Sequence, residues 1–542
     1  MTTDMLSQST VLWALLALQI AMGGFDIVVH HEITERLAWK PNAGQELRLH
    51  AARNALYAVL FGGRAVLQPT GWWAVLLIAI LIVEIVITLW DFVEEDRTRK
   101  LPPTERVLHT LLAINYGAIL AIVLPVLAAW AASATALVPV WYGFGSVILA
   151  IAGIGCLAFA VRDVATSRRA DRLTTPPLPH LAPMIGERKR VLVTGATGYV
   201  GSRLVAALAK DGHDVIALVR DPIRAGHLAT PLTLITRLDE IAPDTRVDAI
   251  VHLAGTPVAD WPWTLPRRLS ILRSRIKIAR QIQAWIAARP AELRPTVQVS
   301  ASAIGFYGER GEETVHEADG AGSGFASRSC QAVEREAGKV RDLGVRTVSL
   351  RIGLVMSRDG GALARMIPAF DLALGGPLGS GRQWMSWIWL DDLVRLIAYA
   401  IDNPDVDGAI NATAPQAIRN GDFARAVGSA LGRPAVIPVP SLLLTTALGE
   451  MGRSLLLGSV RVYPAKAMAT GFAFEAPAFA DMLARELGTP VRELRGEGQP
   501  TAMLSISRVL PSQAAARMRK GGAAEPGRSA TSASVAASRT AT

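Results

Sequence analysis

The sequence is poor in cysteine. Its 542 residues include only Cys156 and Cys330, and Cys156 lies within a long apolar run. Two thiols so placed cannot build a disulfide framework, which excludes a disulfide-stabilised secreted domain and indicates a reducing compartment. The chain after residue 189 also lacks a basic stripe interleaved with aromatic residues. The net charge of +10 therefore does not indicate a nucleic-acid partner.

Charged residues are scarce in the first third of the chain. Hydrophobic residues make up 51% of the sequence, and most of the excess lies before residue 162. Several apolar stretches there are long enough, at about 1.5 Å per helical residue, to cross a hydrocarbon core of about 30 Å. These predicted transmembrane helices are Val11–Val29, Gly71–Trp90, Val107–Trp130 and Leu137–Val161. A fifth stretch, Ala52–Gln68, is interrupted by Gly62, Gly63 and Arg64, which leaves a spanning helix and a surface helix both open.

No lysine or arginine precedes Arg36, which excludes a cleaved signal peptide because such peptides begin with a basic segment. With five spans, Glu32–Arg53, Asp91–Arg106 and the segment after Val161 share one side and hold most of the lysines and arginines. Basic loops mark the cytoplasmic side of a membrane. Residues 1–165 are therefore predicted to form a multi-pass domain of four or five helices in the inner (cytoplasmic) membrane, with the rest of the chain in the cytoplasm.

Carboxylates and imidazoles gather where the predicted spans begin and end. Pairs such as His31 with Glu35, or Asp91 with Glu95, are one helical turn apart and share a helix face. Helix bundles use such side chains to bind iron or manganese. An interfacial salt-bridge network and a metal or quinone site both remain open. The candidate metal ligands are His31, Glu35, His50, Asp91, Glu95 and His109.

Two segments read as connections rather than folded units. Residues 166–188 are rich in Arg, Pro and Thr, and are predicted to form an extended linker facing anionic lipid. Residues 501–542 consist largely of Ser, Ala, Thr, Gly and Arg, and are predicted to be a disordered tail.

A glycine-rich turn organises the second half of the chain. Val191–Gly201 reads VLVTGATGYVG, in which an apolar strand enters a turn with glycines at three-residue spacing and a helix follows. Such a turn brings backbone N–H groups at a helix N-terminus up to a pyrophosphate. The apolar run Asp214–Val219 completes a β-α-β unit. The predicted cofactor contacts in the turn are Gly195, Thr197, Gly198, Tyr199, Val200 and Gly201.

The residue after the second strand indicates which dinucleotide binds. A free ribose 2′-OH is usually held by an acidic residue near this position, whereas a 2′-phosphate needs an arginine. Arg220 stands there and is followed by Asp221. Because a guanidinium group binds a phosphate through two parallel hydrogen bonds, we expect NADP(H), with NAD(H) as the alternative.

Three further buried-strand runs, Asp248–Gly255, Val297–Ser302 and Arg346–Ile352, alternate with helical stretches. This alternation predicts a Rossmann-like, doubly wound parallel sheet within residues 189–500, preceded by an all-α transmembrane bundle. Ligands of such sheets lie over the carboxyl ends of the strands. The predicted cofactor contacts there are Leu253, Ala254, Gly255 and Ser300.

Several motifs together resemble one family. TGATGYVG, HLAG, SASAIGFYG, LRIGLVMSRDGGAL, GGPLGSGRQWMSWIWLDDL and INATAP look like those of the extended, atypical short-chain dehydrogenase/reductases described as sugar-nucleotide epimerase-like. The resemblance covers about Lys189–Leu487. It implies a Rossmann domain followed by a smaller substrate-binding region, built in part from residues after Pro415.

The family's usual catalytic pair is missing. Ordinary members use Tyr-x-x-x-Lys to move a proton, but none of the seven tyrosines here has a lysine four residues on. Ala326 and Cys330 occupy those places, Val333 replaces a usual Trp and Trp389 a usual His. The remaining catalytic candidates are Ser302 and Tyr307, each with a structural interpretation also open. The predicted substrate contacts, in a Gly/Ser-rich loop, are Arg382, Gln383 and Trp384.

Three functions stay open at this point. The first is a membrane-anchored NADP(H)-binding oxidoreductase or epimerase-like enzyme acting on an unknown carbonyl or hydroxyl compound. The second is an NADP(H)-responsive sensor or assembly module. The third is an electron donor to a metal or quinone in the membrane domain. The sequence identifies neither the substrate nor the oligomeric state.

Overall fold

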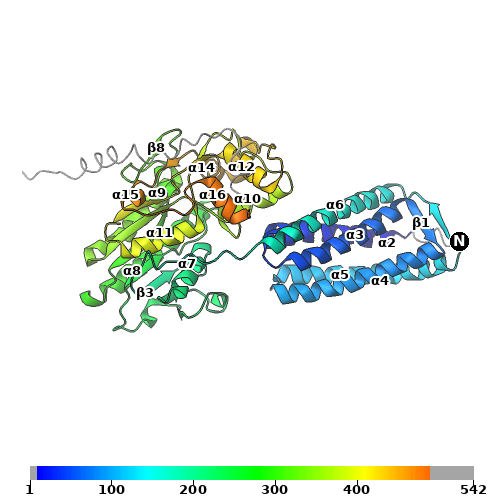
Figure 1. The fold of residues 1–542 in the computed structure, drawn as a ribbon, viewed down its shortest axis with the longest axis horizontal. Helices are drawn as coiled ribbons and strands as arrows, with labels where there is room; N and C mark the ends of the chain where they lie inside the picture. The colour runs from blue at the N-terminus through cyan, green and yellow to red at the C-terminus, as the bar shows by residue number, and fades with distance from the viewer. Residues whose placement is uncertain (1–8, 100, 489–542) are drawn as a thin grey trace, which may run out of the picture.

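The computed structural model describes residues 9–99 and 101–488, which fold into two bodies lying end to end (Figure 1). An elongated helical bundle ends with the helix that reaches Arg172, and an α/β domain begins with the strand that starts at Arg190. The predicted tail, residues 501–542, lies outside the described residues.

Long helices packed side by side form the bundle. They are α2 (Thr10–Phe25), continued by the π-helix η1 (Asp26–Glu35) and the 3₁₀ turn η2 (Leu37–Trp39), α3 (Gly44–Val66), α4 (Trp72–Thr98), α5 (Pro103–Ala131) and α6 (Phe144–Arg172). Four helices, α2 with its continuation, α4, α5 and α6, are long and apolar enough to cross a membrane. At the end far from the α/β domain, β1 (Leu67–Thr70) pairs with β2 (Ala136–Pro139).

Helix α3 is continuous through the glycines that the sequence suggests would interrupt it. Gly62 and Gly63 lie within it, and a Cβ on either would meet no described atom within 4 Å. The close approach of α3 and α6 depends on Gly153 of α6, where a Cβ would lie 2.8 Å from the backbone nitrogen of Gly62.

The connection between the bodies differs from the prediction. Helix α6 continues to Arg172, well past the expected boundary at residue 165. The rest of the connection is packed rather than extended: Leu181 and Ile185 are buried in the core of the α/β domain, and the carboxylate of Asp211 accepts hydrogen bonds from the backbone N–H groups of Leu181 and Ala182. The linker predicted over residues 166–188 is therefore corrected at both ends: residues 166–172 are helical, residues 173–180 have no regular structure, and Leu181 and Ile185 enter the domain core because burying them removes apolar surface from water.

A seven-stranded parallel sheet organises the α/β domain, with the order β13-β9-β7-β6-β3-β4-β5. Its strands are β3 (Arg190–Thr194), β4 (Asp214–Leu218), β5 (Thr233–Ile235), β6 (Ala249–His252), β7 (Val297–Ala303), β9 (Arg346–Ile352) and β13 (Gly408–Ala412). The predicted strands are confirmed, and β5 and β13 are additional. The chain moves outward from β3 to β5 and returns to β6 on the other side. In doubly wound sheets, ligands bind in the crevice outside the carboxyl ends of the strands at such a reversal, which here lies between β3 and β6.

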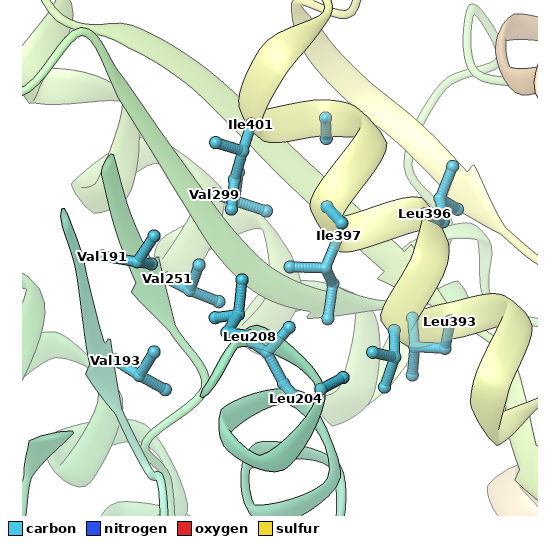
Figure 2. Packing of buried hydrophobic residues seen from close by; sticks show 14 of the residues in the cluster. Val191, Val193, Leu204, Leu208, Val251, Val299, Leu393, Leu396, Ile397 and Ile401 are labelled. Carbon is cyan, nitrogen blue, oxygen red and sulfur yellow. The ribbon is translucent and has the colours of Figure 1, made fainter. Parts of the chain in front are cut away.

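Helices cover both faces of the sheet, as alternate strand residues require. On one face, Figure 2 shows Leu204 and Leu208 of α7 (Tyr199–Lys210) and Leu393 and Ile397 of α11 (Leu390–Asp402) packing over Val191, Val193, Val251 and Val299. On the other face, Ile282 and Ile286 of α8 (Leu265–Ala287) pack against Leu192 and Ile250. Helix α9 (Gly324–Gly338) follows α8 along that face and contacts it and β7.

A smaller region with its own apolar core adjoins the sheet, as the resemblance implies. Its core contains Trp387, Phe370, Phe423 and Phe479. Its helices are α10 (Gly361–Asp371), α12 (Asn420–Leu431), α13 (Ser441–Leu448), α14 (Glu450–Leu455), α15 (Ala465–Ala469) and α16 (Phe479–Leu487). Short strand pairs join them: β10 (Leu354–Met356) with β12 (Trp387–Trp389), β11 (Trp384–Met385) with β14 (Ile418–Arg419), and β8 (Thr314–Val315) with β15 (Arg461–Val462). The 3₁₀ turns of the α/β domain are η3 (Ile223–Ala225), η4 (Leu238–Glu240), η5 (Ala291–Leu293), η6 (Ile304–Tyr307) and η7 (Lys339–Leu343).

Candidate functional site

The turn between β3 and α7 is built so that only glycine fits. Gly195 has φ +77°, and a Cβ there would lie 2.8 Å from the backbone nitrogen of Ala254. A Cβ on Gly201 would lie 2.1 Å from the carbonyl oxygen of Gly195. The turn therefore folds tightly on itself and against the end of β6, while Thr197 and Gly198 at the start of α7 are exposed. An uncovered helix N-terminus with free amides is a ready anion site.

The neighbouring strand end completes the rim of the crevice. His252 is buried, and its Nδ1 lies 2.7 Å from Thr194 Oγ1, which ties β6 to β3. Burial lowers the pKa of His252 to about 4, so the imidazole is a neutral structural link. Leu253 and Ala254 are half-buried beyond it and Gly255 is exposed. Tyr199 and Val200, in the first turn of α7, are half-buried as well.

Arg220 lies exposed just after β4, the position expected for a 2′-phosphate contact. Arg203, one turn into α7, is engaged elsewhere: its Nε and one terminal nitrogen donate to the two carboxylate oxygens of Asp391, each at 2.8 Å. Of these two arginines, Arg220 is thus the one exposed beside the crevice.

A hydroxyl and a carboxylate meet at the carboxyl end of β7. Ser302 Oγ donates to Glu334 Oε1 at 2.6 Å. The Arg351 guanidinium donates to both oxygens of Glu334, from Nε at 3.1 Å and from a terminal nitrogen at 3.0 Å. Arg351 itself lies over the ring of Phe306, 3.4 Å from the ring centroid. The carboxylate is therefore held in one orientation with one oxygen on Ser302.

Glu334 was not among the catalytic residues predicted from the sequence. It follows Ala326 and Cys330 at four-residue spacing on α9, so the three share a helix face. A Cβ on Gly305, in the loop after β7, would lie 3.2 Å from Ala326 Cβ and 4.0 Å from Cys330 Sγ. The face that carries the catalytic pair in ordinary members thus borders the loop after β7 here too, and the helical spacing pointed to Glu334.

Tyr307 does not reach the crevice. Its side chain is fully buried, its hydroxyl donates to Asn411 Oδ1 at 2.7 Å, and it accepts from Arg351 at 2.9 Å. Burial raises the pKa of Tyr307 to about 12. The prediction that Tyr307 is catalytic is wrong, because its hydroxyl is used inside the domain to position Arg351.

Two other predicted contacts are also used internally. Ser300 is buried within β7, where its Oγ accepts from Gln298 Nε2 at 3.0 Å. Gln383 is buried, and its Nε2 donates to the carbonyl oxygens of Leu378 and Leu456 at 3.0 and 3.1 Å. These side chains hold the sheet and the loop together, so we correct their assignment to cofactor and substrate.

The rest of the predicted substrate loop is more open. Arg382 is exposed, and Trp384 is half-buried between the guanidinium groups of Arg419 and Arg461, whose carbons lie 4.3 and 4.6 Å from the ring centroid. The indole N–H of Trp384 donates to Glu312 at 3.0 Å. Arg382 is thus the member of this group with a side chain open to a ligand.

The thiol of Cys330 is not activated. It lies beside Ser302, and burial raises the pKa of the Cys330 thiol above its ordinary value. A buried thiol of raised pKa is a poor nucleophile. This leaves Ser302 with Glu334 as the polar pair facing the end of the sheet.

The predicted metal ligands of the bundle are brought together with one exception. His31, His50, Asp91, Glu95 and His109 lie near one another at the end that faces the α/β domain. Glu35 instead forms an ion pair with Lys40. Asp26 and Glu105, which were not predicted to be ligands, lie in the same cluster.

The α/β domain is similar in sequence to proteins of a known family. Residues 191–412 match the model of the NAD dependent epimerase/dehydratase family, and residues 439–486 match a domain of unknown function, DUF1731. An Arabidopsis thaliana protein described as a chloroplastic epimerase family protein SDR39U1 homolog is 41% identical over 290 residues, which are 53% of this chain and 83% of the relative. An epimerase family protein of Mycobacterium bovis is 36% identical over 286 residues, which are 52% of this chain and 93% of the relative.

One solved structure is similar in both sequence and fold. The crystal structure of human epimerase family protein SDR39U1 (isoform 2) with NADPH has 30% identity and a TM-score of 0.50, and the match covers 55% of this chain and 99% of that one. These relatives thus account for about half of the chain.

Proposed function

The chain belongs to the NAD-dependent epimerase/dehydratase family, and on this premise we propose that it is a membrane-anchored, NADP(H)-dependent oxidoreductase or epimerase-like enzyme acting on a carbonyl or hydroxyl group of a small molecule. The observation that carries the proposal is the 2.6 Å hydrogen bond between Ser302 and Glu334. It provides a proton-transferring pair at the carboxyl end of β7, in a chain that lacks the family's usual Tyr and Lys.

The cofactor side of the proposal rests on the glycine turn. Its shape leaves no room for a Cβ at Gly195 or Gly201 and presents the α7 N-terminus to solvent, which fits a dinucleotide pyrophosphate. The exposed guanidinium of Arg220 suits a 2′-phosphate, and the similar human structure contains NADPH. When bound, the nicotinamide gives or accepts the hydride.

In this proposal, the side chains of the protein transfer the proton. Ser302 exchanges a proton with the substrate oxygen, while Glu334 takes up or returns the serine proton through its 2.6 Å hydrogen bond. Arg351 bonds to both carboxylate oxygens and so fixes the orientation of Glu334. Tyr307 and Asn411 hold Arg351 in turn.

Membrane anchoring is supported by the surface of the bundle. In the most apolar stretches of the four candidate spans only 11–22% of residues are buried, so most of their apolar surface is uncovered. Exposed aromatic residues, Trp72, Trp141 and Phe144, lie at the far end, as expected at a membrane interface. Arg97, Arg106 and Arg172 lie at the end toward the α/β domain. This polarity supports an inner-membrane protein with its α/β domain in the cytoplasm.

The experiment uses the full chain in detergent micelles with NADPH and a panel of carbonyl, alcohol and nucleotide-sugar compounds. For a substrate found in this way, Ser302→Ala and Glu334→Gln should lower kcat about 100-fold or more and leave the Kd for NADPH unchanged. Ser329→Ala is the matched control, because the Ser329 hydroxyl on the same helix as Glu334 has no partner among the described residues. If NADPH binds but no compound changes its absorbance, the enzymatic proposal fails.

A second candidate, an NADP(H)-responsive module, is favoured by one contact. Arg36 at the end of the bundle donates to the carbonyl oxygen of Asp359 at 3.0 Å. The next residue, Gly360, lies so close to the ring of Tyr199 in the cofactor turn that a Cβ there would come within 2.2 Å of it. If this function is correct, Gly198→Asp should abolish the cellular phenotype of the protein while Ser302→Ala preserves it.

A further inference from the structure

The polar cluster at the end of the bundle is separate from the crevice of the α/β domain and has no role in the proposed enzymatic function. We define it by six side chains from η1, α3, α4 and α5. They are Asp26, His31, His50, Glu95, Glu105 and His109. Five of them are buried and His109 is nearly so. Four separate segments of the chain thus direct carboxylates and imidazoles to one point, which is how helix bundles build metal sites.

The central spacings match those between ligands that share an ion. His31 Nε2 lies 3.6 Å from Asp26 Oδ2 and 3.6 Å from Glu105 Oε1, and His109 Nε2 lies 3.1 Å from Asp26 Oδ2. Donor atoms about 2.1 Å from a common ion lie about 3.0 to 3.5 Å from one another. One ligand atom from each of these four residues lies within 4.8 Å of all the others.

The imidazole of His31 is the strongest sign of a missing partner. It is 95% buried, and within the described part of the chain its Nε2 has no hydrogen-bond partner. The nearest carboxylate oxygens, at 3.6 Å, are too far for a hydrogen bond. A buried nitrogen aimed between two carboxylates without bonding to either costs free energy unless an ion or a proton fills the gap.

The charges around the cluster do not balance. The buried carboxylates of Asp26, Glu46, Asp91, Glu95 and Glu105 are accompanied by two guanidinium groups, those of Arg53 and Arg99. Uncompensated buried anions are strongly unfavourable, especially within an apolar bundle. A divalent cation would remove two of the excess negative charges, and protonated histidines are the alternative source.

Outer partners already hold the ligands in place. His30 Nδ1 lies 2.8 Å from Asp26 Oδ1, which leaves Oδ2 facing His31 and His109. Arg99 donates to both oxygens of Glu105, at 2.7 and 2.9 Å. His50 stacks on His31 with ring centroids 4.5 Å apart and an interplanar angle of 8°. Metal sites use such second contacts to orient their ligands.

Space for a small exogenous ligand lies beside the cluster. A cavity of about 10 Å³, about the size of one water molecule, is lined by His31 and His50 together with Glu32, Arg53, Asn54 and Asp163. Of the four proposed ligands below, His31 lines this cavity, so a water molecule there would lie next to the cluster.

We propose that Asp26, His31, Glu105 and His109 bind one divalent first-row transition-metal ion, with His50 and Glu95 beside it. The donors are nitrogen and oxygen without sulfur, and this set suits manganese, iron or zinc. The ion holds the ends of η1 and α5 together and supplies the positive charge that the cluster lacks.

The test uses the full chain in detergent, stripped with a chelator and reloaded separately with Mn²⁺, Zn²⁺ or Co²⁺. Mass spectrometry of the dialysed protein should find about one ion per chain, and Co²⁺ should show the intense visible absorption of a low-symmetry nitrogen and oxygen site. Asp26→Asn and His31→Gln should each lower retention at least tenfold. Glu35→Gln is the matched control, since Glu35 lies on η1 but pairs with Lys40, and it should retain the ion fully.

A wild-type chain that retains no ion after reloading, or a Co²⁺ spectrum identical to that of the hydrated ion, would overturn the proposal and leave a network of protonated histidines. The same holds if His31→Gln retains as much ion as Glu35→Gln. Because both wild-type measurements stand without the variants, the proposal remains testable even if Asp26→Asn and His31→Gln do not fold. None of these readouts depends on NADPH or turnover, so the result is independent of the proposed function.

Discussion

Helices α4 and α7 bury opposite kinds of side chain. On α7 the buried residues are Gly201, Leu204, Val205, Ala207 and Leu208. On α4 they include Glu84, Asp91 and Glu95, while large apolar side chains such as Ile82, Val86 and Leu89 are more than half exposed. One helix follows the rule for a protein in water, and the other inverts it. The difference supports the proposal that the bundle lies in a membrane and the α/β domain in water.

The same contrast governs their charged groups. In the α/β domain, Glu334 is matched by Arg351 and Ser302. Around the polar cluster of the bundle, the five buried carboxylates exceed the two guanidinium groups, and His31 Nε2 has no hydrogen-bond partner among the described residues. Among those residues, the first arrangement is fully paired and the second has one unpaired imidazole nitrogen. The predictions below test each side of this contrast.

The largest effect is expected from Arg351→Met. The guanidinium of Arg351 is nearly buried, and its loss leaves the carboxylate of Glu334 uncompensated, which costs about 3–5 kcal/mol of unfolding free energy. Chemical denaturation of the full chain measures it. Arg280→Met is the control, because the Arg280 side chain is 66% exposed and its partner Glu336 keeps an ion pair with Lys339, so the loss should cost less than about 1 kcal/mol. If both substitutions lowered the free energy of unfolding equally, the charge of Glu334 would not depend on Arg351 for its compensation.

Val86→Lys tests the inverted surface of α4. Val86 is 56% exposed near the middle of the helix, so in water the change would be almost neutral. In a bilayer a lysine there costs about 2.5–3.5 kcal/mol, and the membrane-inserted fraction and the thermal stability in micelles should both fall. Ile223→Lys, at a 92% exposed position of the α/β domain, should leave both unchanged. A neutral Val86→Lys would contradict the membrane assignment.

Gly201→Ala tests how closely the cofactor turn is packed. The added methyl group would lie 2.1 Å from the carbonyl oxygen of Gly195, and relieving this clash costs about 1–3 kcal/mol. The Kd for NADPH in calorimetry should rise tenfold or more. Gly338→Ala, where a Cβ meets no described atom within 4 Å, should leave the Kd unchanged. An unaltered Kd for Gly201→Ala would mean that the pyrophosphate does not rest on this turn.

The smallest effect is expected at Glu317. Burial raises the pKa of this carboxyl above 4.5, and its Oε2 has no hydrogen-bond partner among the described residues. The folded state holds the proton more tightly than the unfolded state, so stability falls as pH rises from the unfolded pKa through the raised folded pKa. Glu317→Gln should therefore be more stable than the wild type by up to about 1 kcal/mol at pH 8. The difference should vanish at pH 4, and a pH-independent difference would contradict this assignment.

The sequence predicted the sheet well because local patterns determine it. Glycine spacing at Gly195, Gly198 and Gly201 and apolar runs of strand length are visible in the chain itself. The sequence did not predict the catalytic side chains correctly, because their roles depend on which of them are buried. Tyr307 and Ser302 are five residues apart and both carry hydroxyls, but only the fold shows that Tyr307 points into the domain.

The metal-ligand predictions missed two residues and included one, Glu35, that lies elsewhere. Glu35 is the last residue of η1, just before Arg36 at φ +52°, and its carboxylate pairs with Lys40 beyond the end of the helix. Asp26 and Glu105 come from segments almost eighty residues apart, so their proximity depends on helix packing that no local spacing reveals.

The connection between the bundle and the α/β domain affects where a ligand can bind relative to the bundle. Leu181 and Ile185 are anchored in the core of the α/β domain, and Asp371 of that domain accepts from Arg169 of α6 at 2.7 Å. Arg36 of the bundle also donates to the carbonyl oxygen of Asp359. These contacts fix the orientation of the α/β domain relative to the end of the bundle, so any ligand of its sheet edge is bound at a defined place beside the bundle.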